Sequence, residues 1–221
     1  MLTTVILSPL VFVWAVPTQT SYDCDISRAK LDLLNTQSIS IPDTVKPEYI
    51  ALAIGTQNYT CSNTRNYSSD GALSILLDVS CLYRSDPKLF RNIQNSTYDL
   101  LLTSGSNAPS LHEIKEVTGY YPYILGDHYF IPQDGTIAPM FDFMRSQDEN
   151  DDSSVVGRQL GGIPSPEGSR NINWLLLEGT DGHLARYIFR VDTQGGQPPE
   201  SCHQIGQKIT VPYTAKYWFF N

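Results

Sequence analysis

The sequence predicts an all-β protein, mainly an antiparallel β-sandwich or a barrel-like sheet, with a few short helices. Apolar runs of strand length recur along the chain, and glycine or an Asp-Gly pair separates many of them. Helical patterns are brief by comparison. The 14 prolines and 15 glycines are spread among these short runs, which is typical of antiparallel sheets and not of strands that alternate with long helices.

The first twenty residues carry no charged side chain. The apolar run Val5–Val16 has the length of the hydrophobic segment of a signal peptide, and it is too short to span a membrane. Val13 and Ala15 are compatible with cleavage after Ala15, so we expect a signal peptide over 1–15 and one secreted domain over 16–221. The alternative is a buried N-terminal strand, because no Lys or Arg precedes the run.

Strand-length runs then follow one another to the C-terminus. They cover residues 49–54, 72–79, 123–125, 128–131, 173–177, 185–191, 208–211 and 215–220. Gly55 is expected to end the first run, and Pro212 is expected to separate the last two. Asp181-Gly182 supplies the positive-φ turn of a hairpin between 173–177 and 185–191.

The second arm of that hairpin has an alternating pattern. Ala185, Tyr187, Phe189 and Val191 alternate with Arg186, Ile188 and Arg190. This alternation predicts that the first set is buried and that the second set faces away from the core.

Three segments have helical patterns, and none is expected to form a long helix. Residues 25–34 have apolar side chains at helical spacing. Asp86-Pro87 begins a second pattern that reaches Ile93, with Asp at the cap and Pro at the first helical position. Ser110 and Glu113 have capping-box spacing in the third, which covers 110–117.

The stretch from about 146 to 168 is rich in acidic residues, Gly and Pro, and is interpreted as a long surface loop inside the single domain. Asp148, Asn150 and Asp152 match the first ligands of an EF-hand loop. The match fails at Ser153 and Gln159, where glycine and a bidentate Glu are needed. We therefore expect a solvated acidic loop and no metal site.

The net charge is -8, and only 17% of the residues are charged. An acidic chain lacks the clustered Lys and Arg that nucleic acids and anionic membranes attract, so neither is an expected partner. No later segment has the length of a transmembrane helix. An extracellular glycan or protein remains the expected partner, and the oligomeric state is left open.

Four cysteines and three glycosylation sequons agree with export. The even number of cysteines predicts two disulfides in an oxidising compartment. Three pairings of Cys24, Cys61, Cys81 and Cys202 are open, with Cys61–Cys202 slightly favoured. Asn58, Asn66 and Asn95 are the sequon asparagines.

A histidine and two aspartates form the catalytic hypothesis. Asp127-His128 lies next to a predicted strand, and Asp142 lies on a later one. A carboxylate beside the imidazole would orient it for acid–base chemistry. A structural, hydrogen-bonded histidine is the favoured alternative.

Aromatic residues form the binding hypothesis. The cluster Tyr120, Tyr121 and Tyr123 adjoins glycine and proline, and exposed rings there would make a platform on which a sugar stacks. The competing interpretation is that the rings fill the core.

Several catalytic motifs are missing from the sequence. It contains no GxSxG elbow, no phosphate-binding GxxxxGK[ST] loop and no GxGxxG dinucleotide fingerprint. We therefore expect no cofactor.

Several runs taken together resemble a family of small secreted proteins. They include 54–61, 71–73, 127–130, 173–177, 187–202 and 211–220. The family is mainly fungal with bacterial relatives and is catalogued as a domain of unknown function. Its members often carry the label malate dehydrogenase, which the missing dinucleotide fingerprint makes a very unlikely activity here. The resemblance brings no catalytic residue, but it suggests that Gln57 and Tyr59, with Gly55, Gly195 and Gly196, line a shared feature. The favoured alternative is a set of tight turns with a tethering disulfide.

The leading functional prediction is a secreted, non-catalytic glycoprotein that binds a glycan, a small ligand or a protein. The first alternative is a secreted enzyme with a His128/Asp142 site. The second is a structural protein of a cell wall or spore coat.

Overall fold

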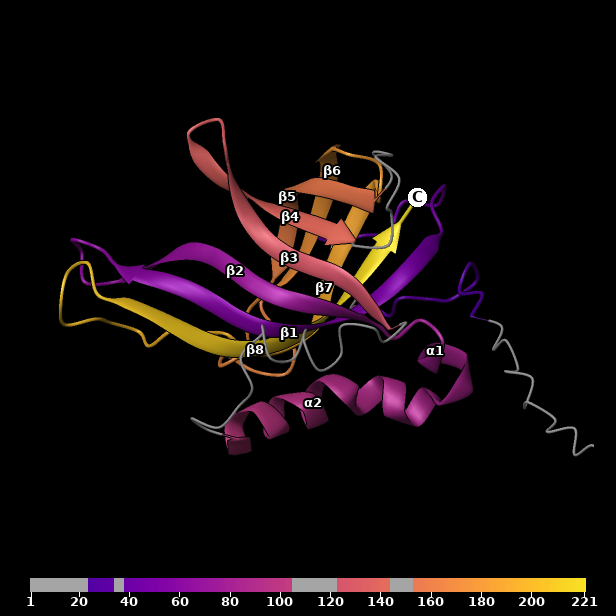
Figure 1. Cartoon of the computed structure of the whole chain (residues 1–221), viewed down its shortest axis with the longest axis horizontal. Coiled ribbons are helices and arrows are strands. Elements are labelled where there is room, and N and C mark those ends of the chain that lie inside the picture. The colour runs from indigo at the N-terminus through magenta and orange to yellow at the C-terminus, as the bar shows by residue number, and fades with distance from the viewer. Residues whose placement is uncertain (1–23, 34–37, 105–122, 144–152) are drawn as a thin grey trace, which may run out of the picture.

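The computed structural model describes residues 24–33, 38–104, 123–143 and 153–221. Its strands form a closed antiparallel barrel in chain order, in which the last strand pairs with the first (Figure 1). The strands are β1 (Pro47–Cys61), β2 (Tyr67–Asp78), β3 (Ile124–Gln133), β4 (Thr136–Phe143), β5 (Ser154–Ile163), β6 (Trp174–Asp181), β7 (Tyr187–Gly195) and β8 (Lys208–Phe220). The predicted all-β class is confirmed, and the barrel is the one of the two expected architectures that forms.

The first and last strands are buried on both faces over residues 50–55 of β1 and 213–220 of β8. Ala51 and Ala53 of β1 face the barrel interior, whereas Ile50, Leu52 and Ile54 face an apolar cluster outside it. Ala51 of β1 stands opposite Tyr217 of β8. The small alanine side chains leave interior space for the aromatic rings of β8.

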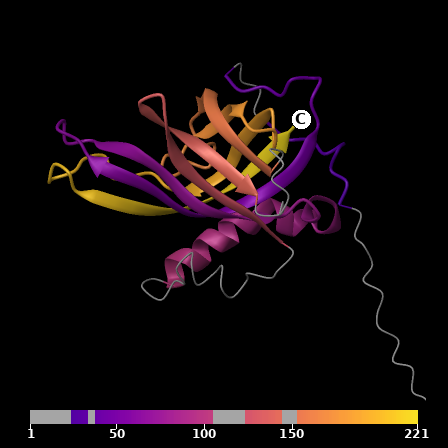
Figure 2. The ribbon, with the colours of Figure 1, turned by 45° about the horizontal axis from the view of Figure 1, so that its top comes forward.

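The two helices account for the outer cluster. Helices α1 (Leu82–Ser85) and α2 (Pro87–Ser104) connect β2 to β3. α2 lies along the outside of the barrel and packs on β8, β7 and β1, as the two views agree (Figures 1 and 2). Phe90, Ile93 and Leu101 of this helix pack against the outer cluster, so the sheet has apolar side chains on both faces.

The start of α2 is as predicted, but its length is not. Asp86 Oδ1 accepts a hydrogen bond from Leu89 N at 2.9 Å, which is an N-terminal cap in front of Pro87. The helix runs eleven residues beyond Ile93, to Ser104. Most residues after Ile93 in this helix are polar, and Leu101 is one of the few that pack on the outer cluster. The apolar pattern of this second half is therefore too weak to predict a helix.

Residues 25–33 do not form the predicted helix. The chain makes one turn, with Ala29 N donating to Ile26 O at 2.7 Å, and is otherwise irregular. Ile26, Leu31 and Leu33 pack on the outer cluster. Their helix-like spacing therefore reflects burial of an irregular segment. The third expected helix, 110–117, lies outside the described residues.

Two residues expected to break strands lie inside them. β1 continues through Gly55, where an added Cβ would collide with the backbone of Leu73. The glycine therefore permits close approach of β2 rather than ending the strand. β8 continues through Pro212, which is exposed and whose carbonyl accepts a hydrogen bond from Gly196 N at 2.9 Å.

The stretch 146–168 is not one long loop, because β5 lies within it. Val155 and Val156 are buried. Gly161 and Gly162 occupy strand positions where a Cβ would collide with the backbone of Ser38 and with the side chain of Leu175, respectively. The glycines that gave this stretch the composition of a loop serve close packing. The candidate calcium ligands Asp148, Asn150 and Asp152 lie outside the described residues.

The prediction for the 174–191 hairpin is right in pairing and wrong in orientation. β6 and β7 pair, and Gly182 has a φ of 78° between them. Ile188 belongs to the interior core, however, and Phe189 and Val191 belong to the outer cluster. Both faces are covered, so hydrophobic alternation cannot identify the inner one.

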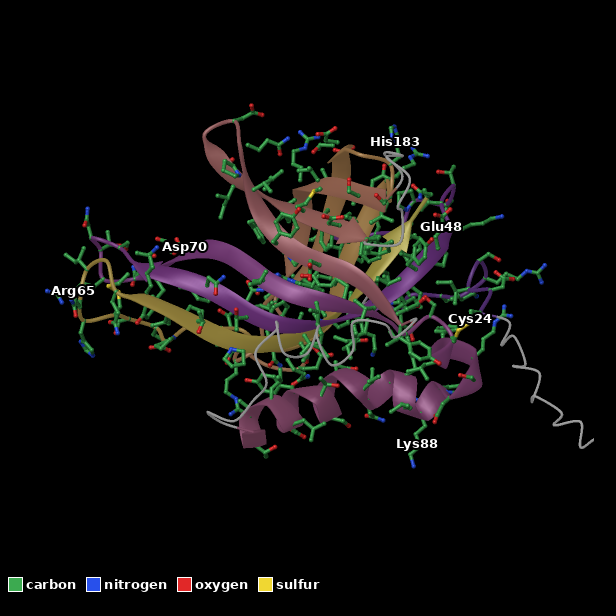
Figure 3. All side chains as sticks on the ribbon, in the orientation of Figure 1. Cys24, Glu48, Arg65, Asp70, Lys88 and His183 are labelled. Carbon is green, nitrogen blue, oxygen red and sulfur yellow. A yellow bond between two sulfur atoms is a disulfide. The ribbon has the colours of Figure 1, made fainter. Side chains whose placement is uncertain are left out.

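Two disulfides join Cys61 to Cys202 and Cys24 to Cys81. The Cys61–Cys202 disulfide is the pairing that the sequence slightly favoured. It lies near the tip of an extension made by β1, β2 and the start of β8, where Figure 3 labels Arg65. The guanidinium of Arg65 donates to His203 O at 2.8 Å across the same tip. Two disulfides indicate an oxidising environment.

Candidate functional site

The candidate site is a cavity at one mouth of the barrel, with a volume of about 520 Å³. It is called the mouth cavity below. It is bounded by residues of β3 to β8: His128, Phe130, Gln133, Asp134, Thr136, Ile137, Ala138, Pro139, Gly157, Arg158, Gln159, Leu175, Leu177, Thr180, Arg190 and Tyr217. Its innermost residues, His128, Leu177 and Tyr217, are buried, whereas Ile137 at the rim is 44% exposed. The cavity is therefore a hollow that enters the barrel interior from solvent.

His128 is held rigidly at the inner end. Its ring stacks on Phe141 with 4.3 Å between centroids and 7° between planes, and the Tyr217 ring lies 5.4 Å away. The Nδ1 atom is 2.9 Å from Met140 O. Because a carbonyl oxygen only accepts, Nδ1 carries the proton and Nε2 keeps its lone pair. Nε2 accepts no hydrogen bond from any residue that the structure describes, so it is available to a donor.

Burial controls the charge of this imidazole. Loss of hydration lowers the pKa of His128 to about 4, although the hydrogen bond to Met140 acts in the opposite direction. The positive charge of Arg190 lowers the pKa further. At neutral pH, His128 is therefore a neutral hydrogen-bond acceptor.

The His128 pKa predicts a specific acid sensitivity. The folded value of about 4 lies below the ordinary value of 6.5, so the unfolded chain binds more protons between these pH values. The contribution of neutral His128 to stability is therefore fully present above about pH 6.5 and is lost as the pH falls toward 4. From pH 7 to pH 4, the free energy of unfolding of His128→Gln should fall by about 3 kcal/mol less than that of the parent, as measured by urea denaturation. Equal losses in the two proteins would contradict the assignment.

Two arginines line the mouth cavity; Arg158 pairs with Glu178, whereas Arg190 pairs with no carboxylate in the described chain. Arg190 stands opposite Leu175 on β6 and Tyr217 on β8, both of which line the cavity. Its Nε and Nη2 atoms both donate to Asn173 O, at 3.1 and 3.0 Å. These two bonds fix the plane of the guanidinium and leave Nη1 without an acceptor in the described chain.

The structure does not bring Asp127 or Asp142 to His128. Asp127 and Asp142 are opposite one another in the β3–β4 ladder, whereas His128 is opposite Phe141. Successive residues of a strand point to opposite faces, so His128 is inside the barrel and the two aspartates are on its outer face. Tyr129 donates to Asp142 at 3.3 Å on that face. The predicted carboxylate–histidine pair is wrong, because a backbone carbonyl orients the imidazole instead.

Of the tyrosine cluster, the structure describes Tyr123, and Tyr120 and Tyr121 lie outside the described residues. Tyr123 is 59% exposed. It borders an apolar hollow of about 800 Å³ beside the Cys24–Cys81 disulfide, together with Leu52, Leu77 and Ile93. Tyr123 is thus an exposed aromatic residue beside this hollow. The hollow and the mouth cavity share no lining residue.

Gln57 and Tyr59 do meet the glycines with which the sequence associated them. Tyr59 donates to Gly196 O at 2.7 Å, and a Cβ on Gly196 would lie 3.1 Å from Gln57 Cγ. Gly196 has a φ of 82°, which favours glycine. Both side chains are buried, so this feature is a tightly packed turn.

The three sequon asparagines differ in exposure. Asn66 is exposed in the β1–β2 turn, and Asn95 is exposed on α2. Asn58 is half-buried within β1, between Gly71 and Thr210 of the flanking strands. Glycan attachment at Asn66 and Asn95 is therefore sterically easier than at Asn58.

No group of three His, Cys, Asp or Glu side chains in the described ranges is arranged to hold a metal ion. Of the two described helices, neither is long and apolar enough to cross a membrane.

Sequence reasoning missed two charged residues inside the fold. Arg190 lines the mouth cavity, and Lys216 is fully buried under α2, where Nζ pairs with Asp192 Oδ2 at 2.9 Å. The sequence feature that could have identified them is their position, because each is a charged residue between two apolar residues of a strand. A single charge within such a run suggests a specific partner on that face.

The family model described as "Protein of unknown function (DUF3455)" matches residues 42–221. The match begins just before β1 and covers the whole barrel. No curated protein and no solved structure matches the chain.

Proposed function

Since the chain belongs to the DUF3455 family of proteins of unknown function and its barrel is hollow at one mouth, we propose that it is an extracellular, non-catalytic protein that binds a small ligand in the mouth cavity. The two disulfides support an oxidising compartment. The sequon asparagines and the predicted signal peptide are consistent with a secreted glycoprotein. The observation that carries the proposal is the hollow mouth of an otherwise filled barrel.

The distribution of interior side chains supports ligand binding. Phe141, Phe143 and Phe219 fill one part of the barrel interior with edge-to-face ring contacts. The mouth cavity occupies another part, where Gly157 provides no side chain. Eight-stranded barrels have room for one small ligand when their interior side chains leave space. The volume of about 520 Å³ lies within the usual range of small-molecule sites.

The lining is also typical of a binding site. Phe130, Leu175 and Leu177 provide apolar surface, and a few polar groups are positioned among them. His128 is immobilised by stacking and Arg190 by two hydrogen bonds. Groups fixed before the ligand arrives lose little entropy on binding. Among the residues that the structure describes, no carboxylate bonds to His128, whose Nδ1 faces a backbone carbonyl instead, and this geometry favours binding over acid–base catalysis.

The proposal is tested with a neutral fluorescent probe, phenylnaphthylamine. The parent protein should bind it saturably with one site per chain. In Leu175→Trp the indole should occupy the cavity and weaken binding at least tenfold, as measured by fluorescence titration. The matched control is Leu160→Trp, because Leu160 is 50% exposed and does not line the cavity. Absence of saturable binding, or equal binding by both variants, would overturn the proposal.

A further inference from the structure

We propose that the mouth cavity takes an amphipathic carboxylate, whose anionic group pairs with the guanidinium of Arg190 and whose apolar body lies against Phe130 and Leu175. This inference rests on the proposed function, because it names the chemical class of ligand for the same site. It starts from Arg190, a charged side chain that lines the mouth cavity and stands between the apolar residues Phe189 and Val191.

The guanidinium is oriented but not neutralised. Asn173 contributes only a backbone carbonyl, which accepts from Nε and Nη2. That carbonyl fixes the guanidinium plane and brings no negative charge. The remaining donors of the fork lie on the Nη1 side, where the described chain offers no acceptor. A planar, preoriented fork with free donors matches a carboxylate.

The described carboxylates nearby are engaged elsewhere or lie at the rim. Asp192 is two residues along β7 but pairs with Lys216 on the outer side of the barrel, at 2.9 Å. Glu178 pairs with Arg158 at 2.5 Å. Asp134 lies at the exposed β3–β4 turn and takes part in no ion pair in the described chain. Arg190 therefore has no carboxylate partner among the residues that the structure describes.

The charge of Arg190 acts through the barrel interior. It opposes the rise in pKa that burial causes at Tyr59 and Tyr213, and it lowers the pKa of His128. Arg190 is half-buried, so water screens its charge less than that of a fully exposed arginine. An anion placed beside it gains more than it would beside a surface arginine.

The rest of the cavity sets the shape of the ligand. Leu175 is opposite Arg190 in the β6–β7 ladder, and Phe130 and Pro139 are opposite one another in the β3–β4 ladder. All four residues line the cavity. A ligand with its anionic end at Arg190 thus places its other end on an apolar wall. A small inorganic anion would leave that wall uncovered, so an organic carboxylate fits best.

The test compares two acids with their neutral isosteres. Phenylbutyrate and decanoate are titrated into the full protein by calorimetry, each beside its primary amide. We expect each acid to bind at least tenfold more tightly than its amide. In Arg190→Met this preference should disappear, while affinity for the amides is retained. The thermal unfolding temperature of each variant checks that the barrel is intact.

Arg186→Met is the matched control, because Arg186 precedes the same strand, is exposed and does not line the cavity. It should keep the full preference for acids. Equal binding of acid and amide by the parent, or a preference that survives Arg190→Met, would overturn the carboxylate assignment and leave the cavity as a neutral site. Failure of all four compounds and of phenylnaphthylamine to bind would overturn the proposed function itself.

Discussion

Replacing Asp192 by asparagine is expected to lower the free energy of unfolding by about 3–5 kcal/mol at pH 7. The side chain of Lys216 is 1% exposed, and Nζ lies 2.9 Å from Asp192 Oδ2 and 4.6 Å from the centre of the Phe90 ring. Without the carboxylate, the buried ammonium would keep only the weaker attractions of the ring and of the Glu167 charge. The chain must then bury an uncompensated charge or release the proton.

Asparagine isolates the effect of charge at this position. Asp192 has a φ of 50°, in the left-handed region that asparagine and aspartate tolerate better than most residues. Asp192→Asn therefore keeps the backbone conformation and nearly the same side-chain shape. Asp192→Ala would mix the loss of charge with backbone strain.

The pH dependence separates this mechanism from simple loss of a contact. Burial lowers the pKa of Lys216, and Asp192 opposes that shift. Removing Asp192 lowers the pKa further, so the unfolded chain of the variant binds more protons than the folded one near neutral pH. Stability of Asp192→Asn relative to the parent should therefore recover as the pH rises from 7 to 10.

A double variant is the control for this pair. Lys216→Met/Asp192→Asn removes the charge that needs compensation, so it should be more stable than Asp192→Asn alone. Urea denaturation of the three proteins gives the comparison. A single variant as stable as the parent, or a double variant that is weaker than the single one, would show that the ion pair does not have this role.

Local signals in the sequence predicted those parts of the fold that depend on neighbouring residues. The Asp86-Pro87 start of α2, the Gly182 turn and the strand runs were predicted from patterns within a few residues. The family resemblance is confirmed as well. These features need no knowledge of what packs on the sheet.

The two sides of the barrel wall could not be told apart in the same way. Helix α2 and residues 24–33 cover the outer face of β7 and β8, so Phe189 and Trp218 are as deeply buried there as Ile188 and Tyr217 are inside. Alternation assumes one wet face. Arg190 and Lys216 consequently lie on opposite sides of the wall, although both interrupt apolar runs.

The His128 site shows why strand register decides a site. Asp127, His128 and Asp142 are all on adjacent strands, and the sequence places them close together. The ladder pairs His128 with Phe141 and Asp127 with Asp142, so the acids and the imidazole lie on different faces. A register one residue different would have placed Asp142 beside His128, whereas Asp127 faces away from its strand neighbour His128 in any register. The two-residue turn Asp134-Gly135, with both residues at positive φ, sets the register that is observed.

Phe141→Ala is expected to lower the free energy of unfolding by about 3–5 kcal/mol. The ring is fully buried, stacks on His128, and makes edge contacts with Tyr217 at 5.1 Å and Phe219 at 5.4 Å. Truncation leaves a void bordered by three ring side chains, His128 of β3 and Tyr217 and Phe219 of β8. Rigid neighbouring rings cannot collapse into it, so the cost should lie at the upper end for a core residue.

A second measurement links this core position to the site. The void left by Phe141→Ala adjoins His128, and water entering it would rehydrate the imidazole, so the pKa of His128 should rise from about 4 toward its ordinary value of 6.5. Titration by NMR detects that change independently of stability. Phe141→Leu should show smaller changes in both readouts, because leucine refills part of the space.

Leu73→Ala, at a side chain that is 44% exposed, should change stability by less than about 0.5 kcal/mol. Phe141→Ala could instead lower stability without changing the His128 pKa. Burial by this ring would then not be the cause of the low pKa of His128, and the charge of Arg190 would have to be the cause instead.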